Sequence, residues 1–170
     1  DIRTAVLSKI SAYNTSNLEG FKKTVYYSKL TKEIDSADDS IVSNDTEIRA
    51  IKIINPALDI DQSYEINFGF PFESETGVIL NTAEYHYGHS IQSSAFTYQG
   101  NRSIVIDDTR GLLYVAKLAG GVVEVKKVIG SVDYTNGIVT IQNLVVSDYE
   151  GSGIKIYARS NTKDFSSTKN

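Results

Sequence analysis

Residues 26–56 read YYSKLTKEIDSADDSIVSNDTEIRAIKIINP and contain, in order, the patterns of a short helix, an acidic turn and a strand. Four apolar residues recur at helical spacing at its start: Tyr27, Leu30, Ile34 and Ala37. Ser28 is placed to cap the N-terminus of this helix. We therefore expect a short helix that begins near Ser28.

The residues after this helix change to an extended pattern. Asp38 and Asp39 would oppose the dipole at a helix C-terminus, so we place them in the following turn. β-branched residues then dominate from Ile41 to Ile53, and their inward face changes phase near Ala50. Such a change predicts a β-bulge in a strand that ends at Asn55-Pro56.

Another helix is predicted before this stretch. One helical face carries four apolar side chains in steps of four, four and three: Ile2, Val6, Ile10 and Tyr13. Asn17, Leu18 and Gly20 then interrupt the pattern. The first 40 residues therefore contain two helices.

Beyond Pro56 the sequence favours strands. Asn136-Gly137 lies between two alternating runs and supplies the positive φ angles of a tight two-residue hairpin turn. Gly120-Gly121 predicts a second hairpin, with Val123 and Val125 inward and Glu124 and Lys126 outward. Further strands are predicted at residues 64–68, 91–98, 103–107 and 154–158.

These patterns predict an α+β fold in three parts. Residues 1–56 form a helix-helix-strand region, and residues 57–159 form a mainly antiparallel β domain, sandwich-like or a meander. Residues 160–170, SNTKDFSSTKN, have Phe165 as their only large apolar residue. This last segment is predicted to be a polar C-terminal tail or a partner-binding arm.

The composition limits the partners. The chain has 170 residues, a net charge of −4 and no cysteine or methionine, and it begins at Asp1, which predicts a piece of a longer protein. The mild acidity argues against nucleic acid or anionic membranes as partners. No apolar run approaches the roughly 20 residues that span a bilayer. We therefore expect a soluble protein.

Two histidines raise the question of a metal site. Glu84, His86 and His89 lie together in EYHYGH. Residues three apart point to opposite faces of a strand, and Gly88 between the histidines favours a surface loop. A metal-dependent enzyme would also need a third ligand or a general base, which this segment does not supply. We therefore predict no metal site.

Acidic residues give no stronger signal. Asp59 and Asp61 open like a calcium loop, but Tyr64 and Phe70 stand where that motif needs Gly and Glu. Asp35, Asp38 and Asp39 are explained by a solvated turn. No serine lies in a nucleophile elbow. We predict no catalytic residue and no cofactor.

Aromatic residues are the best candidates for an interaction surface. The densest group, with Phe165 of the tail added, is Tyr85, Tyr87, Phe96, Tyr98 and Phe165. Tyrosine is favoured at binding surfaces where one end of the side chain stays hydrated. Cross-strand aromatic packing in a sheet is the alternative explanation.

The order of elements in the first third of the chain resembles a known family. The matching segments are Ala5–Ser8, Tyr13, Tyr27–Leu30, Ile34-Asp35 and Asp39–Thr46. They are similar to the C-terminal region of the ring-forming baseplate wedge proteins of T-even-like contractile-tailed phages and, more loosely, to the wider J-like baseplate family. The β-rich remainder is consistent with this family but does not identify it.

The resemblance implies structural work in the virion tail baseplate, after assembly in the bacterial host cytoplasm. Copies would pair with one another, as dimers within a ring, and would contact other wedge, hub or sheath-proximal proteins. The family has no catalytic residues to carry over. The alternative is a tail-associated adhesin module that binds glycan through Tyr85, Tyr87, Phe96 or Tyr98.

Overall fold

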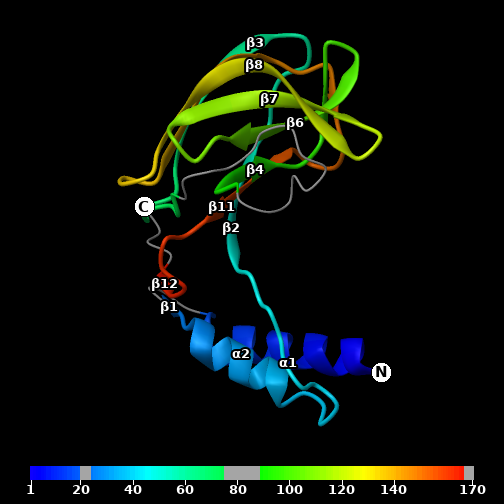
Figure 1. The fold of residues 1–170 in the computed structure, drawn as a ribbon, viewed down its shortest axis with the longest axis vertical. Helices are drawn as coiled ribbons and strands as arrows, with labels where there is room; N and C mark the ends of the chain where they lie inside the picture. The colour runs from blue at the N-terminus through cyan, green and yellow to red at the C-terminus, as the bar shows by residue number, and fades with distance from the viewer. Residues whose placement is uncertain (20–23, 75–88, 167–170) are drawn as a thin grey trace. The chain divides into compact units, whose positions relative to one another are not determined.

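The structure, a computed structural model, describes residues 1–19, 24–74 and 89–166. Its chain forms two compact units (Figure 1). Unit 1 comprises Asp1–Ile48 and Thr162–Asn170, and unit 2 comprises Arg49–Asn161. The predicted α+β class, with two N-terminal helices followed by a mainly antiparallel β domain, is confirmed.

Unit 1 is built on two helices, α1 (Ile2–Asn17) and α2 (Tyr27–Asp35). Asp1 caps α1 by accepting a hydrogen bond from the Arg3 N–H at 3.1 Å. The Tyr13 hydroxyl joins the helices at Tyr26, because it donates to the Tyr26 carbonyl and accepts from the Tyr26 N–H. Of the predicted α1 stripe, only Tyr13 is buried, since a single short helix cannot cover sixteen residues.

The N-terminus of α2 differs from the prediction. Tyr26 is the N-cap residue and makes no side-chain cap, and Ser28 lies within the helix. Instead Asp164, from the C-terminal segment, accepts a hydrogen bond from the Tyr27 N–H at 2.6 Å. The next two residues, β12 (Phe165–Ser166), pair with β1 (Thr24–Val25). The predicted tail therefore contributes to unit 1.

The link after α2 also corrects the sequence analysis. The helix ends at Asp35, so Ala37 lies outside it, while Asp38 is in the predicted turn and accepts from the Ser40 N–H. Residues 41–48 form neither a helix nor a strand, and Val42 is 97% exposed. Strand β2 (Arg49–Ile54) pairs with β11 (Ile154–Arg159) without a register shift. The predicted bulge near Ala50 is therefore wrong.

Unit 2 is a single antiparallel sheet that curves until it is nearly a barrel (Figure 1). Its main path runs β2-β11-β4-β6-β7-β8-β9-β3. Beside this path, β5 pairs with β6 and β10 pairs with β5. The other strands have the following bounds: β3 Asp61–Asn67, β4 Ile91–Ser93, β5 Phe96–Tyr98, β6 Asn101–Asp107, β7 Leu112–Ala119, β8 Val122–Asp133, β9 Ile138–Val145 and β10 Asp148–Tyr149. The predicted strand over residues 91–98 is thus two strands, because β4 pairs with β11 while β5 pairs with β10.

Both predicted hairpins are present. Gly120 and Gly121 form a two-residue turn with positive φ between β7 and β8. Between β8 and β9 the first pair is Asp133↔Ile138, so the loop has four residues and not the two expected. Only Gly137 of this loop has positive φ, and Asp133 accepts hydrogen bonds from the backbone and side chain of Asn136.

Alternate residues of the strands fill one large core in unit 2. It includes the fully buried side chains Leu113, Val115, Val139, Ile141 and Ile156. A smaller apolar cluster lies on the other face of β6 and β7, formed by Ile104, Ile106, Ala116 and Val123. Within the described residues, no helix combines the length and apolar character needed to cross a bilayer.

Candidate functional site

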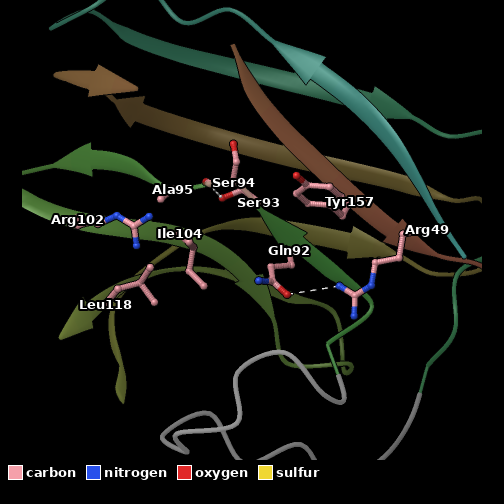
Figure 2. A pocket seen from close by; sticks show the side chains of 9 residues that line it. All are labelled: Arg49, Gln92, Ser93, Ser94, Ala95, Arg102, Ile104, Leu118 and Tyr157. Carbon is pink, nitrogen blue, oxygen red and sulfur yellow. Dashed lines mark hydrogen bonds between the residues drawn. The ribbon is translucent and has the colours of Figure 1, made fainter. Parts of the chain in front are cut away.

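A groove with a volume of about 370 Å³ lies on the outer face of unit 2 (Figure 2). Strands β2, β11, β4, β6 and β7 contribute to it. Its lining residues are Arg49, Gln92, Ser93, Ser94, Ala95, Arg102, Ile104, Leu118 and Tyr157. Alternation along β6 sends Arg102 and Ile104 to this face, while Val105 enters the large core.

Two arginines determine the charge of the groove. Figure 2 shows Arg49 at one end and Arg102 at the other. The Arg49 guanidinium donates from Nη1 to Oε1 of Gln92 at 3.4 Å. This contact orients the buried Gln92 amide so that its Nε2 donor faces the groove (Figure 2). Donor groups therefore lie at both ends of the groove, Arg102 at one end and Arg49 with Gln92 near the other.

The rest of the groove is apolar or already hydrogen-bonded. Ile104 is buried and packs with Leu118 and Ala95. The hydroxyls of Ser93 and Ser94 accept hydrogen bonds from the backbone N–H groups of Val105 and Lys155. These hydroxyls fix the strands in place. An anion with an aliphatic portion would match this combination of arginines and apolar floor.

The side chains that line the groove differ from those of most hydrolytic sites. None of the nine residues is a carboxylate, histidine or cysteine. The described part of the chain also contains no group of three or more His, Cys, Asp or Glu side chains that could hold a metal ion. The groove is therefore suited to binding.

A separate polar cluster lies inside unit 2 around Asp107. Its carboxylate accepts hydrogen bonds from the Tyr134 hydroxyl at 2.6 Å, the Ile91 N–H at 2.9 Å and the Thr109 N–H at 3.2 Å. His89 is also buried, and its Nδ1 lies 2.7 Å from the Asp107 carbonyl oxygen. The cluster joins β4, β6 and the β8-β9 loop.

The environment of Asp107 changes two ionisation equilibria. Burial raises the pKa of the Asp107 carboxyl group, and the hydrogen bond from Tyr134 and the other donors only partly oppose this effect. Burial and the nearby Asp107 carboxylate both raise the pKa of the Tyr134 hydroxyl. The polar groups of the cluster are hydrogen-bonded to one another or to the backbone. We therefore interpret the cluster as a set of contacts that stabilises the fold of unit 2.

The aromatic residues predicted as an interaction surface have different locations. Phe96 is 2% exposed and Tyr98 is 6% exposed, and both rings pack in the large core. Tyr85, Tyr87, Glu84 and His86 lie outside the described residues. Phe165 is in β12, which pairs with β1. The interaction surface at these residues stays a prediction.

A second groove lies near the start of β3. Its volume is about 610 Å³, and its lining includes Asp59, Asp61, Tyr98, Lys127 and Asn143. The two aspartates belong to the segment that begins like a calcium loop. Asp61 is the first residue of β3, which explains why this segment does not curl into such a loop.

The arginine groove was not predicted from the sequence. Arg49, Gln92 and Arg102 are far apart in the sequence. They line one groove only because β11 pairs with both β2 and β4, and β4 pairs with β6. One local signal existed: Arg102 and Ile104 alternate with residues of the core face. That signal places both side chains outside the core but does not reveal their partners.

Comparisons with known proteins concern the N-terminal third of the chain. A search of curated proteins found no match to the chain. The resemblance inferred from the segments between Ala5 and Thr46 is confirmed, because those segments fall inside a matched range. In residues 1–52 the chain is similar to the baseplate structural protein gp6, whose family model for C-terminal domain III matches them.

Proposed function

We propose that this chain is a structural component of a phage tail baseplate that acts through self-pairing and through contacts with other wedge proteins. The observation that carries the proposal is the match of residues 1–52 to a baseplate structural domain. This range contains both helices of unit 1. The described geometry adds a physical reason for association.

Unit 1 has too small a core to be a self-sufficient domain. Among its described side chains only Tyr13 and Ile34 are buried. Several large apolar side chains remain exposed instead: Ile2, Leu7, Ile10, Tyr26 and Val42. Small domains of this kind usually need further contacts to be stable. A second copy or a neighbouring wedge protein would provide them.

Helix α1 is the surface that we assign to self-pairing. At 3.6 residues per turn, Ile2, Leu7 and Ile10 fall within less than half of its circumference. They form an exposed apolar stripe. Packing of this stripe against the same stripe of another copy would remove both apolar surfaces from water. The free energy gained by burying apolar surface drives most protein association.

The proposal excludes catalysis as the function. The groove residues lack a general base, and the Asp107 cluster is inside unit 2 and hydrogen-bonded. The chain would be located in the virion tail baseplate after assembly in the host cytoplasm. Its partners would be other baseplate proteins, not nucleic acid or membrane, in agreement with its net charge of −4.

Sedimentation velocity over a wide concentration range tests self-pairing. We expect a reversible monomer-dimer equilibrium for the wild-type chain. Ile10→Glu places a charge in the apolar stripe and should weaken this equilibrium by at least about tenfold. The matched control is Ser8→Glu, which adds the same charge on the opposite side of α1 at an exposed position.

Two results would contradict the proposed mode of assembly. The first is a wild-type chain that stays monomeric at every concentration and in the presence of the other wedge proteins. The second is an equal effect of Ile10→Glu and Ser8→Glu, because a general charge effect would then replace the assigned surface. Circular dichroism of both variants would establish that the helices remain folded.

A further inference from the structure

The second groove of unit 2 brings together side chains from four separate parts of the chain. Its lining includes Asp61 at the start of β3, Tyr98 at the end of β5, Lys127 in β8 and Asn143 in β9. Its volume of about 610 Å³ exceeds the volume of about 370 Å³ of the arginine groove. Small-molecule sites are commonly hollows of this size.

Tyr98 places an unused hydroxyl at this groove. The residue is only 6% exposed, and its ring packs in the large core. Its hydroxyl makes no hydrogen bond to any residue that the structure describes. Among the described residues no fully buried side-chain oxygen or nitrogen lacks a partner, so this hydroxyl is accessible, and the groove is the hollow that Tyr98 lines. A buried ring that ends in a free polar group is a feature that a ligand would complete.

The backbone holds three more polar residues of the lining in an uncommon conformation. Asp59, Gln99 and Asn143 have φ angles of 58°, 48° and 51°, and they are three of the four described non-glycine residues with positive φ. Their side chains make no hydrogen bond or ion pair within the described part of the chain. Residues in this conformation are concentrated at ligand sites, where the surrounding fold fixes the backbone. Three separate segments therefore present free polar side chains to one hollow.

The charges and hydrogen-bonding groups of the lining favour a neutral ligand. The carboxylates of Asp59 and Asp61 repel an anion, and the Lys127 ammonium group reduces the attraction for a cation. The side-chain amides of Gln99 and Asn143 each donate and accept hydrogen bonds. Hydroxyl groups of a ligand also donate and accept, so a molecule with several neighbouring hydroxyls is complementary to this set.

An apolar side chain lies beside these polar groups. Val145 lines the groove and is 37% exposed. It is the register partner of Asp61 across β3 and β9, so the two side chains lie next to each other on the same face of the sheet. A sugar ring carries hydroxyls around its edge and C–H groups on its faces. Asp61 and Val145 match these two parts of a sugar.

We propose that this groove binds a neutral saccharide. Tyr98 and Asp61 bind hydroxyls of one sugar ring, and Val145 contacts the C–H face of that ring. The amides of Gln99 and Asn143 bind further hydroxyls. The site lies in unit 2 and does not require the assembly role that is assigned to α1 in unit 1.

Nuclear magnetic resonance of the isotope-labelled full chain tests the inference. The probes are glucose, galactose, rhamnose and N-acetylglucosamine, together with neutral trisaccharides of glucose and of N-acetylglucosamine. At least one probe should shift the backbone amide signals of residues 59–61, 98–100 and 143–147 saturably, with a dissociation constant on the order of 1 mM. Tighter binding of the trisaccharides would identify a polysaccharide segment as the ligand, and equal binding would identify a free sugar.

Tyr98→Phe removes the free hydroxyl and keeps the ring in the core. Loss of one neutral hydrogen bond should weaken sugar binding by about fivefold. The urea midpoint of unfolding should not change, because no described residue bonds this hydroxyl. Tyr157→Phe is the matched control, since it removes a tyrosine hydroxyl at the arginine groove and should leave sugar binding unchanged.

A second pair of variants tests the carboxylate. Asp61→Asn should weaken sugar binding by about tenfold, because hydrogen bonds to an ionised acceptor are the stronger ones. Glu65→Gln is the matched control, at an exposed carboxylate of the same strand outside this groove. Ile10→Glu in α1 should bind sugar as tightly as wild type, so failure of self-pairing and failure of sugar binding can be distinguished.

Three outcomes would overturn the inference. One is the absence of saturable shifts at these amides with every sugar of the panel. Another is an equal loss of affinity in Tyr98→Phe and Tyr157→Phe. The third is tighter binding of methylguanidinium than of any sugar, which would assign the groove to a basic side chain of a partner.

Discussion

At the scale of single residues, the hydrogen bond from Tyr134 to Asp107 is the contact with the largest expected effect. Tyr134→Phe removes this 2.6 Å hydrogen bond to a fully buried carboxylate. The unfolding free energy should fall by about 2–3 kcal/mol, measured by urea denaturation. The matched control is Tyr149→Phe, at another half-buried tyrosine of unit 2. Equal losses in the two variants would contradict the role of the hydrogen bond.

The raised pKa of Asp107 predicts a pH dependence. Because burial raises the folded pKa above the unfolded value of 3.8, the stabilising contribution of this group is complete below that value. It is lost as the pH rises through the folded pKa. Asp107→Asn does not titrate, so the unfolding free energy of the variant minus that of wild type should increase between pH 4 and pH 7. Urea denaturation across this range measures it, and a decrease would contradict the direction.

Gly137 is predicted to be intolerant of a side chain. It has a φ of +68°, and an added Cβ would lie 1.9 Å from the Phe70 carbonyl oxygen. Gly151 also has positive φ, +79°, but nothing lies within 4 Å of an added Cβ. Gly151→Ala should cost about 1 kcal/mol from the backbone alone, and Gly137→Ala about 2 kcal/mol more from the clash. Thermal unfolding compares them, and similar costs would refute the steric argument.

At the scale of elements, helix α2 depends on a residue distant in the sequence. Asp164 accepts from the Tyr27 N–H, so Asp164→Ala should lower the stability of unit 1 by about 1 kcal/mol. Helical circular dichroism during thermal unfolding reports the change. Ser28→Ala is the control, because the sequence favours Ser28 as the cap although the structure places it within the helix. A larger loss of stability in Ser28→Ala than in Asp164→Ala would instead identify Ser28 as the N-cap residue of α2.

Local patterns predicted the elements that local physics determines. Helical spacing placed α1 and α2, and glycine pairs placed the β7-β8 hairpin. Contacts between distant segments were not predictable in the same way. The cap from Asp164 and the division of residues 91–98 into β4 and β5 both depend on partners far along the chain.

The candidate site depends even more on contacts between distant segments, which local sequence patterns do not reveal. Its two arginines lie on β2 and β6, which are far apart in the sequence, and only the sheet order brings them to one groove. The aromatic candidates Phe96 and Tyr98 are alternate residues of β5, and both side chains point into the core. The sequence pattern did not indicate which face of this strand would be buried. Residue type therefore indicated binding potential but not exposure.

At the scale of the whole molecule, the two units should differ in autonomy. Unit 2 has its own large core, and residues 49–161 expressed alone should unfold cooperatively in urea. Unit 1 has only two buried described side chains, so its helices should melt first in the full chain unless a partner is bound. Hydrogen exchange distinguishes the units, and equal protection of α1 and β7 in the dilute monomer would contradict this difference.

As a structural part of a phage baseplate, the chain should be present in assembled tails. Tail particles purified from the virus that encodes it provide the most direct test, by immunoelectron microscopy with antibodies against residues 49–161. We expect labelling at the baseplate, in several copies around the tail hub. Labelling at the tips of tail fibres would support the adhesin alternative, and absence of the chain from purified tails would contradict the structural role.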